Sequence, residues 1–365
     1  MKIESKFSVI FKELKDHRMN RTKLHSIENI IFISLSAVIS GAETWNEIEE
    51  FGNNKIEWLS KYLDIPNGVP SHDTFNRFFS SMDTAKFEEC FRKWVATFQK
   101  ELAGDIISID GKSIRGSKGN NLHAVHIVSA WSKNSGITLA QTHTNKKIGE
   151  LNVIPELLDA LFLDGSIVTL DALGAQTNIA SKIVEKGADY VLQIKNNRRQ
   201  MVRDINFSFN MIPIGSKHTF IDKDHGREEK RTITVLYEVD LLRKYEQWAN
   251  LKSIIRVESE SINITTGKIE TSSSYYISSL GTDAKHIGGA IRSHWGVESM
   301  HWMLDVAFSE DRGRKRNENA VINFSLLNKI ALEMLKKEGS SKVGIKSKRL
   351  KAAWSTDYLE SIIGI

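Results

Sequence analysis

Residues 291–316 read IRSHWGVESMHWMLDVAFSEDRGRKR, and the aromatic and charged residues of this stretch recur at three- and four-residue steps. Steps of this length place side chains on one face of a helix. A face with a carboxylate, two histidines and two tryptophans fits neither a plain core nor a plain solvated surface. The helix is followed by RGRKR, which has four cations in five residues. The combination predicts metal chemistry on a polyanion. The residues on the predicted face are Ile291, His294, Trp295, Glu298, His301, Trp302 and Asp305.

The composition is that of a soluble globular protein with two or three domains, because 365 residues contain 41% hydrophobic and 26% charged residues. The net charge of +5 favours an anionic partner. The excess is local, since residues 312–351 contain 12 Lys and Arg against 3 Asp and Glu. The single cysteine, Cys90, excludes an internal disulfide and a Cys-rich zinc module, and we expect it to be buried.

Targeting and membrane signals are not apparent in the sequence. The N-terminus has no apolar run followed by a small-residue cleavage site. The longest apolar run, residues 30–40, is shorter than the roughly 20 residues that a membrane helix needs. We therefore expect a cytoplasmic protein with no membrane partner.

The chain divides into three regions by pattern. Residues 1–100 are predicted to be all-helical, and both a helix-turn-helix DNA reader and a helical packing domain fit them. Ser26 is a predicted N-cap, and either Ser71 or Asp73 is predicted to cap a later helix. Residues 101–340 predict an α/β domain, with three antiparallel strands followed by alternating helix and strand in a mixed sheet flanked by helices. A polar β-like insertion is expected at about 198–280, and residues 341–365 are expected to form a basic tail.

Two aspartates follow similar apolar runs. Asp110 ends IISID and Asp171 ends IVTLD, which places both carboxylates at the open edge of a sheet, where α/β proteins bind ligands. Glu298, on the later helix, adds a third carboxylate. Oxygen ligands of this kind suit Mg²⁺ or Mn²⁺. Two such ions about 4 Å apart activate an attacking hydroxyl and stabilise the leaving oxygen of a phosphoryl transfer.

Other interpretations of these residues remain open. A single aspartate after a strand is common as a helix N-cap or a turn residue. His294, Glu298 and His301 are also compatible with zinc or iron, because Glu-x-x-His is a ligand pair in di-iron bundles. That architecture requires two Glu-x-x-His motifs. His301 completes one of them with Glu298, and none of the other histidines among the 11 completes a second.

Several long motifs resemble a known family. DGKSIRGS (110–117), LDALGAQ (170–176), DHGREEKR (224–231) and the 27 residues from His294 to Ala320 are similar to the DDE transposases of bacterial insertion sequences, of the H-repeat-associated type. Residues 42–52 and 70–83 resemble the helical domain associated with that family. The resemblance implies an RNase H-like core in which Asp110, Asp171 and Glu298 form the DDE triad and bind two metal ions, with a β-rich insertion before the glutamate.

The function implied by this resemblance is DNA transposition in a bacterial cytoplasm, at the nucleoid. The enzyme would cut DNA at the terminal inverted repeats of its element and join the ends to target DNA, as a homodimer in a synaptic complex. Two alternatives are a catalytically silent DNA-binding relic and an RNase H-like nuclease that cuts without joining.

The sequence departs from the family at one signature. Related enzymes carry Tyr and Arg before this glutamate and Lys after it, where this chain has Ile291, His294 and Asp305. For Trp295 and Trp302, stacking on an unpaired base and burial in the core both fit, and we favour burial. A solvated surface charge is the alternative for Lys112, Arg115, Lys195 and the cluster at 312–316. The predicted DNA contacts are Lys112, Arg115, Lys195, Arg227, Arg292, His294, Arg312, Arg314, Lys315 and Arg316.

Overall fold

The computed structural model describes residues 14, 16, 18, 23–119, 123–144, 149–224 and 227–365. Within these ranges, none of the helices has the length and apolar character needed to span a membrane.

The N-terminal region is helical over its described part, as predicted. Ser26 and Ser71 each accept a backbone N–H at the start of a helix, which confirms both as N-caps. Cys90 is buried, also as predicted. The part of the helical prediction that covers residues 1–13 lies outside the described residues. The helices are α2 (Ile27–Ile39), α3 (Trp45–Asn54), α4 (Ile56–Leu59), α5 (His72–Ser81) and α6 (Thr84–Ala96).

The strands of the described ranges form one nine-stranded sheet in the order β3-β2-β1-β4-β5-β9-β8-β7-β6. The first three strands are antiparallel, whereas β1, β4 and β5 pair in parallel. This arrangement confirms the predicted mixed sheet. The strands of this half are β1 (Ile106–Ser113), β2 (His126–Ser132), β3 (Ile137–Thr144), β4 (Ile167–Leu170) and β5 (Asp189–Ile194).

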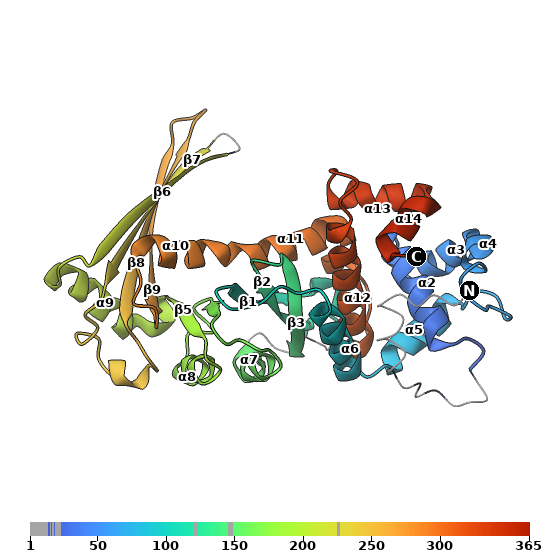
Figure 1. The fold of residues 1–365 in the computed structure, drawn as a ribbon, viewed down its shortest axis with the longest axis horizontal. Helices are drawn as coiled ribbons and strands as arrows, with labels where there is room; N and C mark the ends of the chain where they lie inside the picture. The colour runs from blue at the N-terminus through green and yellow to red at the C-terminus, as the bar shows by residue number, and fades with distance from the viewer. Residues whose placement is uncertain are drawn as a thin grey trace.

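Helices cover both faces of the sheet (Figure 1). On one face lie α7 (Glu150–Asp159) and α8 (Thr177–Glu185), whose segments cross between the parallel strands. Across the other face run α10 (Ala284–Ser293) and α11 (Trp295–Phe308). Figure 1 shows the 20-residue helix α12 (Glu318–Lys337) between the sheet and the N-terminal helices, and this position explains why it is buried almost all round.

The predicted insertion extends the sheet rather than flanking it, because its last strand pairs with β5. Its strands are β6 (Ser216–Asp224), β7 (Arg227–Leu236), β8 (Ser253–Asn263) and β9 (Ile269–Ser278). The β-like prediction for 198–280 missed the helix α9 (Arg199–Met211). This helix is stabilised by tertiary contacts, among them the stacking of Arg256 on the Phe209 ring at 4.5 Å. Local periodicity does not contain that information.

The C-terminal segment is folded and is not a tail. It forms α13 (Ile345–Trp354) and α14 (Thr356–Ile363), which lie against the N-terminal helices (Figure 1). Arg349 is 3% exposed, and it donates to the carbonyl oxygens of Val38 and Ala42 on the N-terminal side. The Arg349 guanidinium is therefore buried and hydrogen-bonded inside the protein. A count of basic residues cannot distinguish such a buried cation from one on the surface.

Candidate active site

The two aspartates lie on neighbouring parallel strands. Ile109 on β1 is in register with Leu170 on β4, so Asp110 and Asp171 are the next residues along two strands about 4.8 Å apart. Asp171 follows the end of its strand, as predicted. Asp110 does not, because Gly111–Ser113 continue to pair with β2 and prolong β1. The loop after Asp110 therefore begins only after Ser113.

Asp171 is fixed by its own loop. Its Oδ1 accepts the backbone N–H groups of Leu173 (2.9 Å) and Gly174 (3.2 Å). The turn after β5 supports the same loop, since the side-chain amide of Asn197 donates to the carbonyl oxygen of Ala172 at 2.7 Å. Asp171 thus has the turn role that we considered as an alternative, and this role holds its carboxylate beside Asp110.

The helix predicted for residues 291–305 is broken into two. α10 ends at Ser293 and α11 begins at Trp295, with His294 between them. His294 Nδ1 lies 2.9 Å from Thr169 Oγ1 on β4, and Ser108 Oγ on β1 donates to the Ser293 carbonyl at 3.3 Å. The junction is therefore anchored to the two strands that precede the aspartates. Sequence reasoning missed both anchors, although polar residues within apolar strands were a signal for them.

Glu298 occupies the first turn of α11, beside this junction. Partial desolvation raises the pKa of its carboxyl group, and the negative charge of Asp110 raises it further, with a smaller contribution from Asp171. The structure therefore brings the three predicted carboxylates within electrostatic reach of one another.

His301 lies one turn beyond Glu298 and contacts Asp110. Its Nδ1 is 3.4 Å from Asp110 Oδ2, and the residue is 9% exposed. Burial raises the pKa of Asp110, but the hydrogen bond and positive charge of His301 outweigh burial and bring that pKa below its usual range. The other ring nitrogen of His301, Nε2, is buried and has no hydrogen-bond partner in the described part of the chain.

The residues present fit a divalent cation with oxygen ligands. Like charges gather at this site, and a cation would relieve the repulsion that raises the pKa of Glu298. The buried Nε2 of His301 leaves a polar atom for a bound group to satisfy. Among the described residues no group of three or more His, Cys, Asp or Glu forms a ready metal cage. Mg²⁺ seldom needs one, because it is usually held by one or two carboxylates, waters and substrate phosphates.

A cleft of about 450 Å³ opens beside Glu298. Its walls are the ends of β4 and β5, the strands of the insertion, and the junction of α10 with α11. The lining is cationic and aromatic as well as polar. Its cationic residues are Lys195, Arg231 and Arg292, and its large aromatic residues are Phe220, Tyr276 and Trp295.

The predicted DNA contacts fall into three groups. Lys195, Arg292 and His294 line the cleft. Arg115, Arg227, Arg312 and Arg314 are exposed elsewhere on the surface. Arg316, exposed like these four, donates to the carbonyl oxygens of Gly116 and Lys118 at 2.7 Å each, which joins the 312–316 cluster to the loop after β1.

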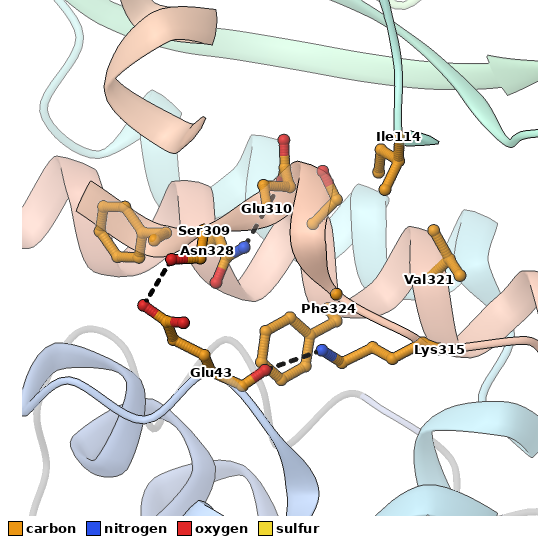
Figure 2. A pocket seen from close by; sticks show the side chains of 11 residues that line it. Glu43, Ile114, Ser309, Glu310, Lys315, Val321, Phe324 and Asn328 are labelled. Atoms are coloured by element: carbon orange, nitrogen blue, oxygen red, sulfur yellow. Dashed lines mark hydrogen bonds between the residues drawn. The ribbon is translucent and has the colours of Figure 1, made fainter. Parts of the chain in front are cut away.

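Lys112 and Lys315 form the third group, and both are partly buried and contact other parts of the chain. Lys112 pairs with Asp305 and Glu310, and only 10% of its side chain is exposed. Lys315 lies 3.4 Å from the centre of the Phe324 ring and donates to the Glu43 carbonyl at 2.9 Å (Figure 2). Burial lowers the pKa of Lys315 to about 8.

The favoured burial of Trp295 and Trp302 is wrong, since these residues are 58% and 61% exposed. α11 buries its opposite face, and the two tryptophans project from the surface on either side of Glu298. The buried apolar residues of α11 are Val297, Met300, Leu304, Ala307 and Phe308.

The mixed sheet, the β-rich insertion and the gathered carboxylates define an α/β protein of the RNase H-like class. Residues 101–334 match the family described as "Transposase DDE domain", and residues 9–95 match that described as "DDE_Tnp_1-associated". The chain belongs to the DDE transposase family, whose members are enzymes of DNA transposition.

Full-length relatives agree with this assignment. The chain is 39% identical to "Putative transposase YncI" of Escherichia coli O157:H7, over 96% of this chain and 92% of the relative. It is 36% identical to "H repeat-associated putative transposase YhhI" of Escherichia coli strain K12, over 96% of this chain and 95% of the relative.

A solved structure shares the fold. The piggyBac transposase, determined by cryo-electron microscopy as a synaptic complex with hairpin DNA, superimposes with a TM-score of 0.50 at 13% sequence identity. The match covers 98% of this chain and 77% of the piggyBac chain.

Proposed function

We propose that this transposase cuts DNA at the ends of a bacterial insertion sequence and joins them to target DNA, with Asp110, Asp171 and Glu298 as its catalytic residues. The observation that carries the proposal is the β1–β4 register, which makes Asp110 and Asp171 neighbours. The raised pKa of Glu298, caused in part by the charge of Asp110, supports the inclusion of the glutamate.

The three carboxylates are proposed to hold two Mg²⁺ or Mn²⁺ ions. When bound, such ions supply an activated water or 3′-hydroxyl and neutralise charge on the leaving oxygen. The other roles belong to residues of the chain. His301 orients Asp110, and the backbone N–H groups of the loop after β4 hold the Asp171 carboxylate in place.

Both chemical steps are in-line displacements at phosphorus. In the first, a water oxygen bonds to the phosphorus at the element end, the bond to the 3′-oxygen breaks, and a 3′-hydroxyl is released. In the second, this 3′-hydroxyl attacks a target phosphodiester and displaces another 3′-oxygen, so one phosphorus–oxygen bond forms for each that breaks. The attacking group loses its proton to solvent, and no covalent enzyme intermediate is required.

The DNA strand near the scissile phosphate is proposed to enter the cleft beside Glu298. Lys195 and Arg292 of its lining offer charge to backbone phosphates, and Trp295 offers an exposed ring for a base. Flanking duplex is proposed to contact Arg115, Arg227, Arg312, Arg314 and Arg316. Since two element ends must meet, the active form is proposed to be a homodimer in a synaptic complex, acting at the bacterial nucleoid.

The test is a Mg²⁺ and Mn²⁺ titration of cleavage and joining with labelled DNA that carries the terminal repeats of the element. Wild type is compared with Asp110→Asn, Asp171→Asn and Glu298→Gln, and with Asp240→Asn, a surface control. We expect metal-dependent joining in wild type and the control, and at least a ~10³-fold loss in each triad variant without loss of DNA binding. Cutting without joining would identify a nuclease. DNA binding without chemistry would identify a relic.

A further inference from the structure

One face of β1 makes a series of polar contacts with the helices that carry the site. Successive side chains of a strand alternate between faces, so every second residue of β1 points toward α10 and α11. Three consecutive residues of this face each meet a different position along the helices. The three contacts are Ser108 with the Ser293 carbonyl (3.3 Å), Asp110 with His301 (3.4 Å) and Lys112 with Asp305.

The last of these contacts is partly enclosed, since 10% of the Lys112 side chain and 34% of the Asp305 side chain are exposed. Besides Asp305, Lys112 Nζ lies 2.8 Å from Glu310 Oε2, and only 4% of the Glu310 side chain is exposed. Figure 2 shows Glu310 on the turn after α11, where the Asn328 amide of α12 reaches its other oxygen at 3.5 Å. Lys112 therefore joins β1 both to the last part of α11 and to the turn that follows it.

The apolar contacts of α11 resist sliding through close packing, as at Gly296 against the Trp131 ring, but apolar burial has no direction and specifies no partner. The Lys112 ammonium group has specific partners, because it is mostly buried and a displacement away from its carboxylates would leave a buried charge unpaired. Glu298 follows the break at His294 by one turn, so its position depends on how α11 is placed.

We propose that Lys112 is a positioning residue, whose ion pair with Asp305 sets the axial position of α11 on β1 and thereby holds Glu298 opposite Asp110 and Asp171. This inference rests on the proposed function, because metal-dependent catalysis by Asp110, Asp171 and Glu298 requires accurate placement of their carboxylates. A displacement of about 1 Å in such a site costs on the order of 10²-fold in rate.

The test compares Asp305→Ala with Asp311→Ala. Both changes remove a carboxylate near Lys112, but Asp311 lies 3.9 Å from Nζ and is not on α11. In both variants Glu310 still pairs with Lys112, so both proteins are expected to fold, which the melting temperature checks. The readouts are Mn²⁺ affinity from electron paramagnetic resonance, the joining rate, and the affinity for terminal-repeat DNA. Glu298→Gln provides the reference for lost metal affinity.

We expect Asp305→Ala to weaken Mn²⁺ binding about tenfold and to slow joining by about 10- to 100-fold, with unchanged affinity for DNA. Asp311→Ala changes none of these, and the conservative variant Asp305→Glu restores most of the rate. In a Lys112→Met/Glu310→Gln background, which removes both charges of the Lys112–Glu310 pair, Asp305→Ala adds no further loss.

Three results would overturn the inference. One is equal Mn²⁺ affinity and rate in Asp305→Ala and wild type. Another is a gain in DNA affinity in Asp305→Ala, because Lys112 would then be a phosphate contact freed from its partner. The third is Mn²⁺ binding that Glu298→Gln leaves unchanged. Failure of the proposed function is distinct, since a wild type without DNA chemistry would still lose Mn²⁺ affinity in Asp305→Ala.

Discussion

Nδ1 of His301, on α11, lies 3.4 Å from Oδ2 of Asp110, on β1. The contact joins the helix that carries Glu298 to the strand that carries Asp110. These two segments are far apart in the sequence, because most strands of the sheet lie between them in chain order. His301 is nearly buried. Its contact with Asp110 and the Lys112–Asp305 pair are two polar contacts between α11 and β1, and the side chain of Glu298 is exposed above them. Residues next to the proposed triad therefore contact both the strand that carries Asp110 and the helix that carries Glu298.

Glu310→Gln is expected to flatten the acid limb of the stability curve. Burial raises the pKa of Glu310, but the charges of Lys112 and Lys329 outweigh it and bring the pKa to about 2. A depressed carboxyl pKa contributes stability that is fully present above about pH 4.5 and is lost as the pH falls toward 2. The contribution at neutral pH is about 3 kcal/mol.

Urea unfolding of wild type and Glu310→Gln between pH 2 and 7 measures this effect. The variant is less stable at neutral pH, since two lysines lose their buried partner, and its stability falls less steeply between pH 4.5 and 2. Equal slopes for the two proteins would show that Glu310 does not titrate in this window.

Arg314 and Lys315 are adjacent in sequence but are expected to differ in DNA binding. Arg314 is exposed, whereas Lys315 lies over the Phe324 ring and donates to the Glu43 carbonyl. Arg314→Ala should weaken DNA binding and reduce the salt slope of log K by about 1. Lys315→Met should leave both unchanged. Salt titrations of fluorescence anisotropy test the pair, and a reduced slope in Lys315→Met would place that lysine on DNA.

Gly296→Ala is expected to disturb the first turn of α11. Gly296 lies two residues before Glu298, and a Cβ added there would overlap the ring of Trp131 on β2. We expect a loss of about 1–3 kcal/mol in stability from overpacking, and slower joining. Gly289→Ala, on α10, is the matched control, because a Cβ there meets nothing within 4 Å. If both variants join DNA ends at the wild-type rate, the first turn tolerates the displacement.

Arg349→Lys is expected to destabilise the protein by about 2–4 kcal/mol, because an ammonium group cannot reproduce the donor geometry of guanidinium in a buried site. The guanidinium donates to carbonyls of the N-terminal helical region and to the Ala307 carbonyl of α11. Lys346→Met, an exposed change on the same helix, should stay within about 0.5 kcal/mol. Urea denaturation compares them, and equal losses would contradict an interior role for Arg349.

Local patterns were enough to predict the class of the sheet, the helix cap at Ser26, Ser71 as one of two candidate caps, and the positions of Asp110 and Asp171 after apolar runs. These features are local, because alternation, capping and turn chemistry depend on neighbours a few residues away. The family motifs were also legible, since they are long and continuous.

Which charged residues face water and which are buried could be learned only from the packed chain. Lys112 and Arg349 looked like surface cations, and Trp302 looked like core, yet the first two are enclosed and the tryptophan is exposed. Each outcome depends on partners from distant segments, such as Glu310 for Lys112. The break at His294 has the same origin, since β1 and β4 anchor the junction. Burial and pairing are properties of the packed chain, and no local pattern carries them.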